Sequence, residues 1–195
     1  MFPFPGRMVS AVSWFSSLVK FFRAPAAARL VRDGHVLHWK PADLPINVWV
    51  DGGEQSRAAV LSAVRYMRGL GAPLMFPEAL EPATRNTFFA SRETFEGAIV
   101  VQPYVTTEGP GAFRCTSDLR FDKRDGTMRN VLIEWNVSPG DYAGNVKRLI
   151  HEFGHCLGLD HEPGTIMQDR VSNWGEVSGF SAAQLRYIKS MRGST

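Results

Sequence analysis

The stretch from His151 to His161 constrains the fold of this chain more than any other segment, and it reads His-Glu-Phe-Gly-His-Cys-Leu-Gly-Leu-Asp-His. His151 and His155 lie four residues apart, which on an α-helix is about 40° of rotation and one turn of rise, so both imidazoles leave the same face and can bind one ion. Gly158 allows the positive φ that ends a helix and turns the chain back. His161 can then supply a third nitrogen.

Glu152 adds an acid to this predicted metal site. It lies beside the histidines on the helix and can reach a metal-bound water without being a ligand. Three protein ligands and one open position are typical of catalytic zinc sites, whereas structural zinc sites are closed by four ligands. The alternative is a core helix with hydrogen-bonded histidines. It is disfavoured because two potential ligands and an adjacent acid seldom coincide with a turn that delivers a third ligand.

Composition indicates a globular chain of 195 residues, forming one domain or one domain with an appendage. Apolar residues make up 44% and charged residues 21%, which is ordinary for such a protein. A formal charge of +3 is too small to indicate nucleic acid as a partner, and none is expected. Cys115 and Cys156 are not a disulfide framework, and Cys156 is interpreted as a small buried residue.

Residues 1–40 differ from the rest and are assigned to an amphipathic N-terminal segment and linker. Apolar side chains and a narrow polar stripe predict an amphipathic helix over Met8–Arg23, too short and too interrupted to span a bilayer. Three interpretations stay open: a targeting segment, an interfacial membrane helix, or a helix that docks on this domain or on a partner.

Residues 45–193 are assigned to one compact domain. Alternation over Ile46–Val50 predicts a strand, and helical spacing predicts a helix over Glu54–Arg68 with Asp51 as its N-cap. Gly69 and Gly71 are expected to end this helix. The pattern therefore begins as a strand followed by a long helix.

Further strands are predicted before the metal-binding helix. Thr87–Ser91 is a candidate strand, and the apolar run within Gly97–Tyr104 predicts a strand that is covered on both faces. Phe113–Phe121 and Asn130–Val137 are predicted to pair, with Asp122 and Asp125 as hairpin residues between them.

The metal-binding helix is expected to begin with Ser138 as N-cap and Pro139 in its first turn. Its predicted core stripe contains Tyr142, Val146, Leu149, Ile150, Phe153 and Leu157. A last helix is predicted over Ala182–Met191, capped by Ser181.

The pattern His151-Glu152-x-x-His155-x-x-Gly158-x-x-His161 resembles the signature of the metzincins, a group of zinc metallopeptidases. Phe153-Gly154 and Leu157-Gly158-Leu159 make it most similar to the matrixin branch, the matrix-metalloprotease-like peptidases. Gly164–Met167 resembles the methionine turn of that family, with Met167 as a hydrophobic floor under the zinc and not as a ligand. Phe180–Gly193 is similar to the last matrixin helix. The resemblance covers 45–193 in outline and 149–193 in motif detail.

This resemblance implies an α+β fold. It comprises a twisted, mostly parallel sheet with one antiparallel edge strand, a long helix after the first strand, the zinc helix, the methionine turn and a C-terminal helix. It also implies a zinc-dependent endopeptidase, with one catalytic Zn²⁺ bound by His151, His155 and His161 and with Glu152 as general base. Protein or peptide substrate is expected along the edge strand within 113–120, with Gln168–Trp174 lining the pocket after the scissile bond.

The sequence departs from matrixins in several respects. The spacer from His161 to Met167 is short, and no histidine lies between His38 and His151, so the second, structural zinc of animal matrixins is not expected. No cysteine precedes Cys115, so the thiol-switch propeptide of that family is not expected. His35 and His38 are interpreted as solvent-facing polar residues.

Two other functions remain open. One is a non-catalytic, zinc-stabilised structural or surface module, against which the intact Glu152 argues. The other is membrane or partner binding through residues 8–23. A secreted, membrane-associated or virion-associated location is preferred to a strictly cytoplasmic one, and the sequence does not indicate an oligomeric state.

Overall fold

The computed structural model describes residues 27–76, 96–104, 115–136, 142–169, 176 and 178–194. The predicted helix over 8–23, the candidate strand over 87–91 and the predicted start of the zinc helix at Ser138 and Pro139 lie outside these residues. So does most of the segment Gln168–Trp174. Among the described helices, none is long and apolar enough to cross a membrane.

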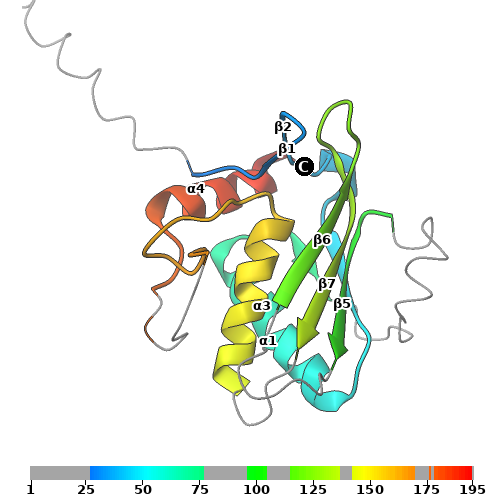
Figure 1. Ribbon diagram of the computed structural model, residues 1–195, viewed down its shortest axis with the longest axis vertical. Helices are drawn as coiled ribbons and strands as arrows, with labels where there is room; N and C mark the ends of the chain where they lie inside the picture. The colour runs from blue at the N-terminus through cyan, green and yellow to red at the C-terminus, as the bar shows by residue number, and fades with distance from the viewer. Residues whose placement is uncertain are drawn as a thin grey trace, which may run out of the picture.

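The described elements follow one another in the order that the resemblance implies (Figure 1). They are β1 (Val31–Arg32), β2 (His35–Val36), η1 (Pro41–Asp43), β3 (Ile46–Val50), α1 (Glu54–Leu70), β4 (Leu74–Met75), β5 (Ala98–Tyr104), β6 (Cys115–Phe121), β7 (Met128–Asn136), α3 (Tyr142–Cys156), α4 (Ala182–Ser190) and η2 (Met191–Ser194).

A mixed sheet with the strand order β4-β3-β5-β7-β6 forms the centre of the described fold. β3 pairs in parallel with both β4 and β5, and β5 pairs in parallel with β7. β6 pairs antiparallel with β7 and lies at the edge. The α+β class and the mostly parallel sheet with one antiparallel edge strand are therefore confirmed.

Side chains on alternate positions of the strands divide the core between the two faces of the sheet. Val48, Ile99 and Ile133 belong to the large core that also contains the buried side chains of α1 and α3. Val100 and Leu132 are buried on the opposite face. Because the first four residues of β5, Ala98 to Val101, are all buried and point alternately to opposite faces, the prediction of an apolar run covered on both sides is confirmed.

α1 begins later than its predicted cap. Gly53, in extended conformation, is the N-cap and forms no side-chain cap bond, so the assignment of Asp51 as N-cap was wrong. The Asp51 amide donates to the Val101 carbonyl at 2.9 Å, which keeps Asp51 in the sheet instead of at the helix start. The helix ends at Gly71, one of the two predicted glycines, whose φ of 105° places it in the left-handed region. Gly69, which was also expected to end the helix, lies inside it, because α1 continues to Leu70.

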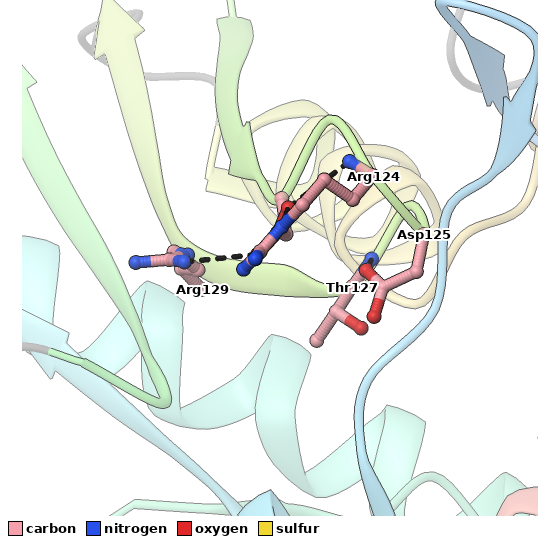
Figure 2. Close-up of polar contacts among 5 residues, drawn as sticks. Arg124, Asp125, Thr127 and Arg129 are labelled. Atoms are coloured by element: carbon pink, nitrogen blue, oxygen red, sulfur yellow. Dashed lines mark hydrogen bonds and ion pairs between the residues drawn. The ribbon is translucent and has the colours of Figure 1, made fainter.

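The hairpin between β6 and β7 is held by the two aspartates that the sequence placed there. The Asp122 carboxylate accepts from the guanidinium groups of Arg124 and Arg129, and these bonds lower the pKa of Asp122. Asp125 accepts from the amide of Thr127 at 2.8 Å (Figure 2). Both carboxylates are thus used as hairpin residues, as predicted.

Packing begins before the predicted start of the domain at residue 45. Leu30, Leu37 and Trp39 are buried, and they belong to the same core as the sheet and α3. His38 joins this segment to the hairpin, because its amide donates to the Gly126 carbonyl and its carbonyl accepts from Met128. Residues 30–39 are therefore part of the folded unit and not a linker.

Candidate metal centre

α3 carries two of the three predicted ligands on a helix that is buried along most of its length. Leu149, Ile150 and Phe153 lie in the core, as the predicted stripe requires. Tyr142 was wrongly assigned to that stripe, since it is 43% exposed and its hydroxyl bonds to the Ala58 carbonyl and the Ser62 hydroxyl of α1. Its position in the first turn leaves the ring at the edge of the core.

The structure brings the three predicted histidines together. The Nε2 atom of His155 lies 3.1 Å from the Nε2 atoms of both His151 and His161. Within the described residues, these three side chains form a group in which one ring nitrogen of each lies within 4.8 Å of the others. Zn–N bonds of about 2.0–2.1 Å at tetrahedral angles would place such nitrogens about 3.3 Å apart, so the two 3.1 Å separations from His155 are close to those of a zinc site.

Backbone carbonyls fix the orientation and tautomer of the two helical histidines. The Nδ1 atom of His151 lies 2.7 Å from the Ile166 carbonyl, and that of His155 lies 2.9 Å from the Leu159 carbonyl. Because a carbonyl can only accept, each Nδ1 carries the proton and each Nε2 of a neutral ring presents a lone pair. Lone pairs aimed at one point repel one another unless a cation lies between them, and this is how metal-binding histidines are usually oriented.

Burial keeps these rings neutral. Desolvation lowers the pKa of both rings, and that of His155 falls to about 4. His151 is 6% exposed and His155 is 8% exposed. Neutral imidazole is the form that binds a metal, so the two helical ligands do not have to lose a proton near neutral pH.

His161 reaches the site from the turn that follows α3. Gly158 has a φ of 85°, and its amide donates to the His155 carbonyl, so the helix ends there as the sequence predicts. The side chain of His161 is 40% exposed, and its Nδ1 atom lies 3.5 Å from a carboxylate oxygen of Asp169. The third nitrogen therefore lies at the solvent side of the group, where an open coordination position would be accessible.

Glu152 follows His151 on α3 and is 5% exposed. Cys156 lies one turn further along and is a free, fully buried thiol. Burial and the negative charge of Glu152 raise the pKa of the Cys156 thiol well above its usual value. Cys156 thus stays protonated, and the structure confirms it as a small buried residue.

Met167 lies beneath the segment between the two helical histidines. It is completely buried, and a Cβ atom added to Gly154 would lie only 2.2 Å from the Met167 sulfur. Its turn is closed by a bond from the Glu162 amide to the Met167 carbonyl and by a bond from the Met167 amide to the Thr165 hydroxyl. The close contact at Gly154 explains why this helix position has no side chain.

Other predicted site residues lie elsewhere or cannot be placed. His35 and His38 are half-buried and belong to the segment beside the β6–β7 hairpin. The predicted pocket segment is described only at Gln168 and Asp169. Asp169 belongs to that predicted segment, but its contact with His161 was not predicted. The carbonyls of Leu159 and Ile166 were also not predicted, because a backbone acceptor has no sequence signal.

Comparisons with known proteins find distant similarities in structure only. No protein-family model matches the sequence, and no curated protein matches it. One similar solved structure is high choriolytic enzyme 1, a hatching-enzyme zinc protease from the medaka Oryzias latipes. It is 12% identical with a TM-score of 0.45, covering 86% of this chain and 98% of that chain. Another is myroilysin, which is 16% identical with a TM-score of 0.43, covering 95% of this chain and 98% of that chain. Because both similarities are so distant, the case for an activity depends on the residues of this chain.

Proposed function

We propose that this chain is a zinc-dependent endopeptidase. The observation that carries the proposal is the convergence of three Nε2 atoms, two from α3 and one from the turn after it, beside a buried glutamate. Two of the rings are held with their lone pairs inward by backbone carbonyls. Three nitrogen ligands with one open position are the arrangement of a catalytic zinc site.

Each residue has a distinct task in this proposal. His151, His155 and His161 would hold the ion as neutral imidazoles. When bound, zinc supplies a Lewis acid that polarises the scissile carbonyl and acidifies water. The Glu152 carboxylate takes a proton from the attacking water and returns it to the leaving amine. Met167 supports the helix from below, and Gly158 directs the chain so that His161 faces the other two ligands.

Substrate is proposed to bind as an extended strand beside β6. In the described sheet β6 pairs only with β7, so its other edge has backbone groups that a peptide could bind. This mode uses main-chain hydrogen bonds for affinity and side-chain pockets for specificity. The matrixin-like branch remains a prediction from the motif.

A non-catalytic zinc module is the second candidate, and the burial of Glu152 counts against it. Burying a carboxylate costs free energy, and a purely structural zinc site does not need that carboxylate.

Membrane or partner binding through residues 8–23 is a separate proposal. It predicts that full-length protein binds liposomes and that protein lacking residues 1–26 does not. The deletion stops there because Leu30, Leu37 and Trp39 belong to the core.

The proposed activity can be tested by cleavage of a peptide library. Wild type, Glu152→Gln and an Arg65→Gln surface control would be compared at equal zinc content, with and without a chelator. We expect wild type and the control to cleave only with zinc, and Glu152→Gln to retain zinc but lose turnover. Cleavage by Glu152→Gln at the wild-type rate would contradict the assigned base, and absence of wild-type cleavage at full zinc occupancy would favour the non-catalytic module.

A further inference from the structure

The C-terminal end of α3 is capped by side chains from both ends of the domain. A helix leaves its last carbonyls without partners inside the helix, and buried carbonyls need partners elsewhere. Here three consecutive carbonyls each accept from a different side chain. The indole of Trp39 donates to Cys156 at 2.6 Å, the hydroxyl of Tyr187 donates to Leu157 at 2.8 Å, and the guanidinium of Arg29 donates to Gly158 at 3.3 Å.

Arg29, Trp39 and Tyr187, which we call the clamp, are themselves linked. The Arg29 guanidinium lies 3.9 Å from the centre of the Tyr187 ring, within the range of a cation–π contact. Its second arm donates to the Leu37 carbonyl at 3.1 Å. Arg29 thus ties the segment before β3 to α4 and to the end of α3. Figure 1 shows that segment, in blue, running beside α4.

Backbone bonds attach the same segment to the turn that leads to His161. The Leu30 amide donates to the Gly158 carbonyl, and the Asp160 amide donates to the Ala28 carbonyl. A Cβ atom added at Gly158 would lie 2.7 Å from the Leu37 carbonyl oxygen, so the two stretches pack with no spare room. The position of the turn is therefore fixed from outside the helix.

The clamped turn connects directly to two of the proposed ligands. Leu159, within the turn, provides the carbonyl that orients His155, and His161 follows it after one residue. A shift of this turn would rotate one ring and displace the other. Sites of this kind lose function when their supporting geometry is loosened by about 1 Å.

We propose that Arg29, Trp39 and Tyr187 are positioning residues of the metal centre, and that zinc affinity depends on their hold on residues 156–160. This inference rests on the proposed zinc binding. It assigns a role to a segment that the sequence pattern placed outside the catalytic domain. Removing a group bonded directly to a metal ligand typically weakens metal binding by 10–100-fold. The clamp acts one step further out, through the turn that carries the Leu159 carbonyl, so single clamp variants are expected to lose about tenfold in zinc affinity, the lower end of that range.

The test compares zinc dissociation constants by competition with a chromophoric chelator. Tyr187→Phe keeps the ring under Arg29 but removes the bond to Leu157, and Arg29→Met keeps an apolar stem but removes both carbonyl bonds. Arg29→Lys retains a charge over the ring and should give an intermediate affinity. Two controls accompany them: Arg65→Met, an exposed arginine of α1, and Val100→Ala, a core truncation on the face of the sheet opposite α3.

We expect the clamp variants to bind zinc about tenfold more weakly and the controls to stay within about twofold of wild type. Equal affinities for clamp variants and wild type would overturn the inference, as would an equal loss in Val100→Ala, which would indicate general destabilisation.

Hydrogen exchange in zinc-free protein provides a second readout. Tyr187→Phe and Arg29→Met should speed exchange of the amides of residues 157–160, whereas unchanged exchange would refute the clamp. If wild type binds no zinc, the proposed function fails, while the exchange result still decides whether the clamp holds the turn.

Discussion

Substitution of Gly154 by alanine tests the contact between the methionine turn and the metal-binding helix. Gly154 lies on α3 between His151 and His155, and an added Cβ would lie 2.2 Å from the Met167 sulfur and 2.8 Å from its terminal methyl. Because Met167 is fully buried, its sulfur and terminal methyl can shift away from the added Cβ only by repacking against neighbouring core side chains. The substitution therefore overpacks the site, whereas alanine at a helix position is otherwise favoured.

The expected magnitude follows from these two opposing effects. Overpacking a core costs about 1–3 kcal/mol, and alanine gains about 0.5–1 kcal/mol over glycine within a helix, so Gly154→Ala should destabilise by about 1 kcal/mol. Gly69, in α1, is the matched control because an added Cβ there would meet nothing within 4 Å. Gly69→Ala should stabilise by about 0.5–1 kcal/mol.

Urea unfolding in the presence of a chelator measures both changes without any contribution from zinc. Truncating Met167 to alanine should remove the clash, so that Gly154→Ala becomes neutral or stabilising in that background. A stabilisation of Gly154→Ala equal to that of Gly69→Ala would refute the reasoning. So would an unchanged effect of Gly154→Ala in the Met167→Ala background.

Three further changes bear on the same centre. In metal-free protein, burial lowers the pKa of His155 from its usual 6.5 to about 4. Between these two pH values the unfolded chain therefore binds a proton at His155 that the folded chain does not. Unfolding free energy should therefore fall as pH decreases through that window, by roughly 3 kcal/mol at its lower end, and a flat urea profile would contradict this. His161→Ala should weaken zinc binding by more than about a hundredfold, since it removes a ligand and not merely an outer partner; a near-native dissociation constant would exclude it as a ligand. Gly158→Ala should destabilise by about 2 kcal/mol or more, through a φ of 85° and the contact with the Leu37 carbonyl, and an unchanged thermal midpoint would argue against that strain.

Much of the site could be predicted because its information is local in the sequence. The offset between His151 and His155 fixes a common helix face, and Gly158 fixes the turn that brings His161 back. Ser181 was likewise predicted from local sequence as the cap of the last helix. The structure confirms Ser181 as the N-cap of α4, where it forms a capping box with Gln184. The sheet arrangement came from the family resemblance and not from the strand patterns themselves.

The parts that were missed depend on long-range packing. Arg29 and Trp39 lie more than a hundred residues from the carbonyls of Gly158 and Cys156 to which they donate, and nothing in their local sequence marks them as partners of α3. Asp51 matches the sequence pattern of a helix N-cap. Its amide instead donates to the Val101 carbonyl, a long-range bond that keeps Asp51 in the sheet and that the local sequence does not show. Tyr142 matched the helical period of a core residue, yet its place in the first turn left it at the edge of the core.

X-ray absorption at the zinc edge of protein loaded with one equivalent of zinc tests the central claim most directly, because it reports the ligand atoms themselves. We predict three imidazole nitrogens and one further light atom at about 2.0–2.1 Å, with no sulfur shell. The three-nitrogen pattern should be lost in His155→Ala. A sulfur contribution at about 2.3 Å, or fewer than three imidazoles in wild type, would contradict the assignment of His151, His155 and His161 as the metal site.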